Sequence, residues 1–320
     1  MNLRHLVVVL AASLLQAAAW AAWPERPIKL IVPFPPGGPN DVIARVVAEP
    51  LAQQLGQPVV VENKAGAGGT IGSDAGAKAA ADGYTLTLGS TSSHSLPTLL
   101  GQKIGYSPLT SFAPVGLIGS TPTVLLATPR AGLGSYTEML AQARAHPGRL
   151  NYASSGNGTL NHLVTESFKQ RTGLFIVHIP YRGTGQAMAD LLAGQIDLMF
   201  DAAITASPQV KAGKLRALAV AGSRRLADLP AVPTFDELGL RGFQASLWVG
   251  LLAPAGTPTA VTQKLNDELQ RALRRPEVVA RMMGMGFEPL PGPAEALATH
   301  MKAVEQAWAQ VVRERQIKPD

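Results

Sequence analysis

Short segments rich in glycine and in hydroxyl or amide side chains recur along the chain, and nearly all of them follow a stretch that predicts a β-strand. Glycine lets a backbone approach a ligand closely, while Ser, Thr and Asn supply neutral hydrogen-bonding groups. Most of these segments also open a predicted helix, whose free N–H groups and positive dipole end suit a carboxylate. One such segment is weak evidence, because turns and caps use the same residues. Six at equivalent places predict a ligand-binding cleft, and they are residues 34–41, 63–70, 89–94, 154–159, 181–184 and 201–203.

Catalytic arrangements are poorly supported by the spacing of the reactive side chains. The sequence has no G-x-S-x-G elbow and no H-E-x-x-H motif, and its six histidines show no ligand-like pair spacing. His94 and His162 lie in or next to candidate loops, and as bases they would need an oriented nucleophile such as Ser92 or Ser154. An exported hydrolase that uses His94 or His162 therefore stays open as an alternative.

A run of glycines, Gly66, Gly68 and Gly72, follows the second predicted strand and is similar to a dinucleotide fingerprint. No acidic residue ends a third strand about 20 residues further on, which the ribose contact of that fingerprint requires. We therefore expect no nucleotide and no other cofactor.

Composition removes further classes of protein. The 320 residues are 46% hydrophobic, which is ample for a packed core, and they include no cysteine. Disulfide scaffolds, Cys-ligated metals and thiol catalysis are excluded, and we expect no metal site. The net charge is +6, and the densest basic group, Arg271 with Arg274 and Arg275, has no interleaved aromatic residues. We expect no nucleic-acid partner.

Elements that must position the candidate loops follow an alternating pattern of strands and helices. This pattern predicts an α/β protein with parallel sheets and helices on both faces. The predicted strands are 28–32, 58–61, 84–88, 123–127, 150–153, 175–179, 196–200, 215–220 and 247–252. The predicted helices are 40–55, 71–80, 135–145, 161–170, 185–193, 259–273, 276–283 and 294–315.

Two α/β blocks, each a mostly parallel sheet flanked by helices, account for most of the chain. The tail from about residue 231 has too few strands to fold alone, so we expect it to cross back and complete the first block. The prediction is one lobe of residues 22–120 plus 231–320, a second lobe of residues 121–230, and a ligand cleft between them. Two crossovers, near 115–125 and 225–245, would let the lobes close as a hinged clamp.

The first 21 residues have the features of a secretory signal peptide. Arg4 gives a positive start, an apolar stretch of about ten residues follows, and Ala19-Trp20-Ala21 is a suitable cleavage site. That stretch is too short to span a bilayer, and no later window holds 18 consecutive apolar residues. We expect an exported protein that is not inserted in the membrane.

Several motifs occur in a fixed order over residues 23–290, among them PFPPGGPND at 33–41 and YASSGNGT at 152–159. The others are residues 23–28, Arg45, 61–69, 82–86, His162 with Leu163, 180–183, 194–197, 213–219, 232–234, Glu237 and 253–258. Together they resemble the extracytoplasmic solute receptors of tripartite tricarboxylate transporters, often called Bug receptors. Asn40 departs from the pattern, where Thr or Ser is commoner, and Thr159 stands where Ser is common.

The resemblance implies a two-lobed periplasmic-binding-protein fold of the Venus flytrap kind, type II-like. It implies a monomeric receptor in the Gram-negative periplasm that presents a small carboxylate to the membrane permease subunits of a secondary transporter. The carboxylate would be a di- or tricarboxylate, an acidic amino acid or an aromatic acid. A ligand sensor that feeds a membrane histidine kinase stays open as another alternative.

The resemblance also implies which residues hold the ligand. In such receptors backbone N–H groups and hydroxyls from the first-strand loop and the second-lobe loops bind the carboxylate. His94 could pair with a second carboxylate, and Asp201 could accept from a ligand amine or hydroxyl. The variable segment 90–94 would help to set specificity. The expected contacts are Phe34, Gly37, Gly38, Asn40, Asp41, Gly69, Ser90, Ser92, His94, Ser154, Gly158, Thr159, Gly183, Thr184 and Asp201.

Overall fold

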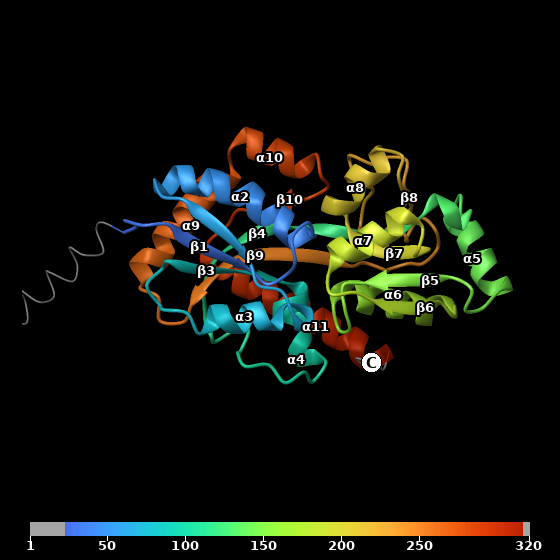
Figure 1. The fold of residues 1–320 in the computed structure, drawn as a ribbon, viewed down its shortest axis with the longest axis horizontal. Coiled ribbons are helices and arrows are strands. Elements are labelled where there is room, and N and C mark those ends of the chain that lie inside the picture. The colour runs from blue at the N-terminus through green and yellow to red at the C-terminus, as the bar shows by residue number, and fades with distance from the viewer. Residues whose placement is uncertain (1–22, 316–320) are drawn as a thin grey trace, which may run out of the picture.

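A computed structural model describes residues 23–315 of the chain. The predicted signal peptide and its cleavage site therefore lie outside the described residues. The described part forms two α/β lobes side by side, joined by the long strand β4 (Phe112–Ala127) and by β9 (Ser246–Pro254). Figure 1 shows these strands running from one lobe into the other.

Lobe 1 is built on three parallel strands, β2–β1–β3, continued by the antiparallel strands β9 and β4. Its strands are β1 (Ile28–Val32), β2 (Val59–Asn63), β3 (Thr85–Ser90) and the short β10 (Glu288–Pro289). Its helices are α2 (Pro39–Leu55), α3 (Thr70–Ala77), α4 (Leu96–Leu99), α9 (Thr259–Leu273), α10 (Pro276–Met283) and α11 (Ala294–Arg315). A 3₁₀ turn (Ala67–Gly69) and a π-helical turn (Thr91–Ser95) complete it.

Lobe 2 repeats the plan with β7–β5–β6 in parallel and with β4 antiparallel to both β7 and β8. Its strands are β5 (Asn151–Ser154), β6 (Val177–Pro180), β7 (Leu198–Ala202) and β8 (Arg216–Val220). Its helices are α5 (Tyr136–Ala145), α6 (Leu160–Thr172), α7 (Thr184–Ala193), α8 (Ala203–Lys211) and a 3₁₀ turn (Pro129–Ala131). The predicted mixture of parallel strands with flanking helices is confirmed.

The first half of β4 is the main element that the sequence did not predict. Pro114, Gly116, Gly119 and Pro122 interrupt its apolar pattern, and the pairing with β9 shifts register at Pro114/Gly116 and at Leu117/Gly119. Proline and glycine of this kind are typical of bulges and irregular strand segments. The structure adds the helices α4 and α8, the strand β10 and the short turns, and the predicted strands and helices are present with small differences at their ends.

A cluster of aromatic rings indicates where the chain crosses for the second time, from lobe 2 back to lobe 1. Phe235 packs 5.6 Å from Tyr136, 5.8 Å from Phe168 and 5.8 Å from Phe200, measured between ring centroids. These three partners belong to lobe 2, and Phe243 joins the same cluster. We therefore propose that lobe 2 extends to about residue 245, rather than to 230, and that the chain returns to lobe 1 at β9.

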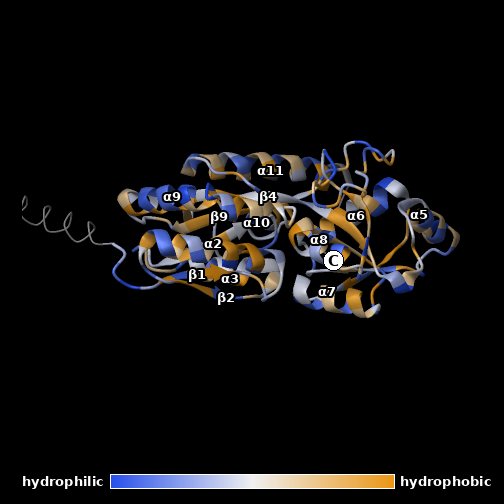
Figure 2. Cartoon of the chain, turned by 90° about the horizontal axis from the view of Figure 1, so that it is seen from above, coloured by the Kyte–Doolittle hydropathy of each residue, from blue (hydrophilic) through white to orange (hydrophobic). Residues whose placement is uncertain are grey.

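Residues of α2 and α6, among them Leu51 and Phe168, belong to the main buried apolar core. Figure 2 shows apolar and polar residues mixed along both helices. The long helix α11 runs beside the crossing strands, and its C-terminal part reaches lobe 2 (Figures 1 and 2). Within residues 23–315, no helix combines the length and apolar character that a membrane crossing needs.

Candidate functional site

A small cavity of about 20 Å³ lies between the lobes and is lined by residues from both. Since one water molecule needs about 10–15 Å³, the cavity as it stands admits little more than one water. Its floor comes from the crossing strands and its walls from helix starts. The lining residues are Phe34, Pro35, Gly38, Pro39, Asn40, Ser92, Thr123, Ser155, Leu160, Asn161, Thr184, Asp201, Ala202 and Leu247.

Four helix N-termini contribute to this lining. The helix α2 begins after its N-cap Gly38 with Pro39 in the first turn, where the missing N–H costs nothing. The helices α6, α7 and α8 begin beside the cavity at Leu160, Thr184 and Ala203. The N–H groups of a helix's first turn have no partner within the helix, and they lie at the positive end of the helix dipole. The arrangement can therefore hold an anion with neutral groups alone.

Three buried polar atoms at the cavity have no hydrogen-bond partner within the described part of the chain. They are Asn40 Oδ1, Thr123 Oγ1 and Asp201 Oδ1. The three residues are 5%, 1% and 0% exposed. Leaving a buried polar atom unpaired costs about 1–3 kcal/mol, so each marks a place where a ligand group would be stabilised.

Asp201 is the only ionisable side chain among the described residues that line the cavity. Its other oxygen, Oδ2, accepts a hydrogen bond from Thr205 Oγ1 at 2.6 Å. Burial raises the pKa of Asp201 to about 7, although the hydrogen bonds from Thr205, the Ala202 N–H and Asn161 act in the opposite direction. Burial therefore works against ionisation of this carboxyl group.

Asp41 and Gly37 serve lobe 1 itself, although both were predicted to contact the ligand. The carboxylate of Asp41 accepts from Gly37 N–H at 3.0 Å, Asn63 Nδ2 at 2.9 Å and Arg45 Nε at 3.0 Å. Burial opposes ionisation, but the hydrogen bonds from Arg45, Gly37 and Asn63 outweigh it and hold the pKa of Asp41 below its ordinary value. The cluster fixes the turn that leads into α2.

The structure places His94, which was predicted to contact the ligand, away from the lining of the inner cavity. Its ring lies inside lobe 1 against Tyr106, Phe112 and Trp248, with centroid distances of 5.6, 5.0 and 6.5 Å. Its Nδ1 is 2.9 Å from Ser93 Oγ, and complete burial lowers the pKa of His94 to about 3. Ser90 is buried beneath the same turn, where its side chain caps the N–H of Ser93.

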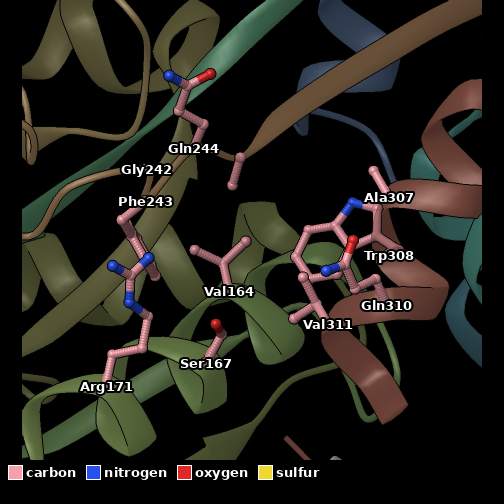
Figure 3. Close-up of a pocket in the computed structure, with 11 residues that line it drawn as sticks. Val164, Ser167, Arg171, Gly242, Phe243, Gln244, Ala307, Trp308, Gln310 and Val311 are labelled. Carbon is pink, nitrogen blue, oxygen red and sulfur yellow. The ribbon is translucent and has the colours of Figure 1, made fainter. Parts of the chain in front are cut away.

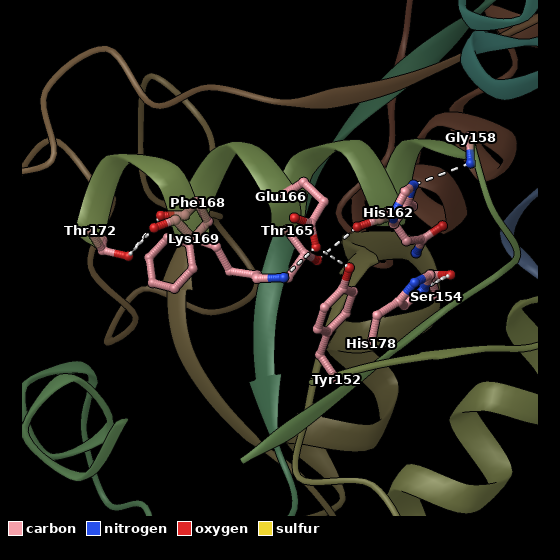
Figure 4. Close-up of polar contacts among 11 residues, drawn as sticks. Tyr152, Ser154, Gly158, His162, Thr165, Glu166, Phe168, Lys169, Thr172 and His178 are labelled. Atoms are coloured by element: carbon pink, nitrogen blue, oxygen red, sulfur yellow. Dashed lines mark hydrogen bonds and ion pairs between the residues drawn. The ribbon is translucent and has the colours of Figure 1, made fainter. Parts of the chain in front are cut away.

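In lobe 2 the predicted Ser154, Gly158 and Thr159 support the loop rather than line the cavity. Ser154 Oγ is 2.7 Å from His178 Nε2 and accepts from Gly156 N–H at 3.1 Å. Gly158 N–H donates to His162 Nδ1 at 3.2 Å, and Thr159 Oγ1 donates to Gly156 O at 2.6 Å. Figure 4 shows the contacts of Ser154 with His178 and of Gly158 with His162. The rings of His162 and His178 are stacked, with their centroids 4.5 Å apart.

Two serine–histidine contacts lie in this region, and neither joins a predicted base to a predicted nucleophile. Ser154 bonds His178 rather than His162, and His94 bonds Ser93 rather than Ser92. Ser154, Ser93 and His94 are fully or almost fully buried, so a substrate could not reach them in this arrangement.

Direct contacts join the lobes around the cavity. Leu160 N–H, at the start of α6, donates to Ser92 Oγ of lobe 1 at 3.1 Å. Gly183 lies so close to Pro35 that a Cβ placed on it would come within 2.6 Å of Pro35 Cγ. Within lobe 1, Gly69, which was also predicted as a contact, lies equally close to the ring of Phe34: a Cβ placed on it would be 2.6 Å from Phe34 Cζ. The lobes are therefore closed on each other.

An outer cleft of about 940 Å³ is also lined by both lobes, and it shares the lining residues Pro35 and Ser155 with the inner cavity. Loop 65–70 and residues 102–104 line it from lobe 1, and residues 155–157, Tyr181, Arg182 and Gln186 line it from lobe 2.

A separate pocket of about 320 Å³ lies between α6 and α11 and shares no lining residue with the inner cavity (Figure 3). Its charged group, Arg171, donates to Arg241 O and lies 5.6 Å from the ring centroid of Phe243. No helix N-terminus opens into it, so it lacks the anion-binding feature of the inner cavity.

Of the predicted contacts, six line the inner cavity: Phe34, Gly38, Asn40, Ser92, Thr184 and Asp201. Sequence reasoning missed Thr123, Ser155 and Asn161. Ser154 and Ser155 are adjacent, and side chains alternate at the end of a strand, so only the second reaches the cavity. Asn161 directly follows the first residue of α6, and a polar residue at a helix start was the available signal. Thr123 lies in the crossing strand, where nothing in the pattern separates it from its neighbours.

Comparison with known proteins agrees with this architecture. The model of the tripartite tricarboxylate transporter family receptor matches residues 43–317. Protein BugT of Bordetella pertussis is 42% identical over 323 residues, covering 98% of each chain.

Three solved structures are similar throughout. The periplasmic binding protein BugD has a TM-score of 0.89 at 38% identity, over 93% of this chain and 100% of its own. Rpa4515 of R. palustris with adipate has a TM-score of 0.90 at 34% identity, with the same coverage. MatC of Rhodopseudomonas palustris with bound malate has a TM-score of 0.85 at 35% identity, over 91% of this chain and 100% of its own. The chain thus has the two-lobed fold of periplasmic binding proteins and belongs to the tripartite tricarboxylate transporter receptor family.

Proposed function

We propose that this protein is a periplasmic receptor that binds a small carboxylate between its lobes and presents it to a membrane permease of the tripartite tricarboxylate type. The observation that carries the proposal is the meeting of four helix N-termini at a cavity without a lysine or arginine. Charge-assisted hydrogen bonds to a carboxylate are worth about 1.5–3 kcal/mol each, so neutral donors suffice for tight binding.

Family membership and the carboxylates bound to two similar structures support the same substrate class. The similarity to periplasmic binding proteins and the features of residues 1–21 support export to the periplasm. We assign no catalytic role, because the buried histidines serve packing and loop support.

A thermal-shift screen of the mature protein tests this proposal. The protein is unfolded and refolded to remove carried-over ligand, and then melted with mono-, di- and tricarboxylates, aromatic acids, amino acids and matched neutral amides. A ligand at about 100 times its Kd stabilises by about 2.7 kcal/mol, which raises Tm by several degrees. We expect at least one acid to give this shift while its amide does not. A shift with amides alone would contradict the proposal.

A further inference from the structure

The unpartnered atoms of the inner cavity share one chemical property. Asn40 Oδ1 and Asp201 Oδ1 are acceptors, and Thr123 Oγ1 accepts as well as donates. A hydroxyl or ammonium group on the ligand could donate the hydrogen bonds that these oxygens lack. A plain carboxylate offers only acceptors at neutral pH, so it could use the helix N–H groups but would leave these oxygens unpaired.

The charge of the cavity lining also favours a ligand that carries a hydrogen-bond donor. The only ionisable group among the described lining residues is acidic. A ligand carboxylate beside ionised Asp201 would place two like charges in one dry cavity, which is unfavourable. A donor on the ligand would separate the two carboxylates and bond Asp201.

We propose that this receptor selects acids that carry a hydroxyl or ammonium group next to the carboxylate, and that Asp201 is the residue that recognises this donor. The inference rests on the proposed function and specifies its substrate class.

The positions of the three residues explain why donor and carboxylate would be neighbours on the ligand. Asn40 belongs to the first turn of α2, and Asp201 comes directly before Ala202, the N-cap of α8. Each acceptor therefore lies beside the free N–H groups of a helix start. Asn40 is in lobe 1 and Asp201 in lobe 2, while Thr123 lies on the strand that crosses between them. A ligand donor that bonded both sides would connect the closed lobes.

Isothermal titration calorimetry with matched acids tests the proposal at pH 8, above the pKa of about 7 to which burial raises Asp201. Each series holds a plain acid, its 2-hydroxy form and its 2-amino form: propionate, lactate and alanine; succinate, malate and aspartate; glutarate, 2-hydroxyglutarate and glutamate. In the series that binds best, we expect a donor-bearing member to bind at least about tenfold more tightly than the plain acid, equivalent to about 1.4 kcal/mol. The hydroxy and amino arms show which donor is used.

The variant Asp201→Asn should bring the donor-bearing and plain acids to within about threefold of each other, mainly by improving the plain acid and weakening the amino acid. Asp267→Asn, an exposed aspartate on α9, is the matched control and should keep the wild-type preference. Thr123→Val, which keeps the side-chain shape, should lose part of the preference and serves as a second test.

Two results would overturn the inference while leaving the receptor function intact. In one, the wild-type protein binds the plain and donor-bearing acids equally. In the other, its preference survives in Asp201→Asn. Failure of every acid in these series and in the thermal-shift panel, in folded protein, would instead contradict the proposed function.

Discussion

At the scale of single residues, Asp201 is a fully buried carboxyl group in the inner cavity. One of its oxygens has no hydrogen-bond partner among the described residues. The residues around it were predictable to different degrees. Asn40 and Asp201 could be named from loops that follow strands, since ligands of open α/β sheets gather at the carboxyl ends of strands. His94 could not be excluded from the cleft, because its burial depends on Tyr106, Phe112 and Trp248, which are distant in sequence.

Substitution Asp201→Asn should stabilise the ligand-free protein in a pH-dependent way. The pKa of Asp201 in the folded protein, about 7, lies above the ordinary value of 3.8, so the native state favours the protonated form. The stability that Asp201 contributes is present below about pH 4 and is lost as pH rises to about 7. We expect the unfolding free energy of Asp201→Asn to exceed that of the wild type by about 1–4 kcal/mol at pH 8, with the gain shrinking toward pH 4.

Urea denaturation at pH 5, 6, 7 and 8 measures this difference, with Asp267→Asn as the control for an exposed aspartate. A difference that stays constant across these pH values would show that Asp201 does not titrate with a raised pKa.

At the scale of elements, the glycine run 66–72 illustrates how a motif can be structural. Gly72 lies in the first turn of α3, and a Cβ on it would be 2.4 Å from Lys64 O and 2.7 Å from Pro33 Cα. Both atoms are backbone and cannot move aside cheaply. The glycine thus lets α3 pack against the end of β1, which explains its spacing without a nucleotide.

The replacement Gly72→Ala should therefore destabilise the protein by about 1–3 kcal/mol through overpacking. Gly292→Ala is the matched control, because its Cβ would have an ordinary contact at 3.5 Å and its φ is not positive. Chemical denaturation of the two variants compares them. Equal stabilities would mean that α3 shifts without cost.

Most elements could be predicted, because their apolar period and caps are local properties of the sequence. Ser135, for example, caps α5 by accepting from Glu138 N–H at 3.1 Å. The first half of β4 could not be predicted, since its strand geometry comes from pairing with β9, about 130 residues later, and overrides its prolines and glycines.

For the whole molecule, the size of the inner cavity implies motion. About 20 Å³ admits no three-carbon acid, so a ligand can enter only if the lobes separate. The crossing strands β4 and β9 are the elements about which such an opening would turn.

A cross-link between the lobes should therefore block ligand uptake. A Cβ on Gly183 would lie 3.5 Å from Pro35 Cβ, close to the separation of about 3.5–4.5 Å in disulfides. The chain has no other cysteine, so Pro35→Cys with Gly183→Cys gives one defined pair. We expect the ligand-free oxidised variant to bind no ligand, and the same sample to recover binding after reduction.

Stopped-flow binding measurements on the oxidised and reduced forms of this variant provide the comparison, with each single cysteine variant as a control for the substitution. Uptake at the same rate in both forms would mean that the ligand enters without separation of the lobes.

A crystal structure with the acid that gives the largest thermal shift tests the central claim most directly. We expect the acid between the lobes, with its carboxylate at the N-termini of α2 and the lobe 2 helices and with contacts to Asn40, Thr123 and Asp201. Density for the acid elsewhere, for instance beside Trp308 between α6 and α11, with the inner cavity unchanged, would contradict the account.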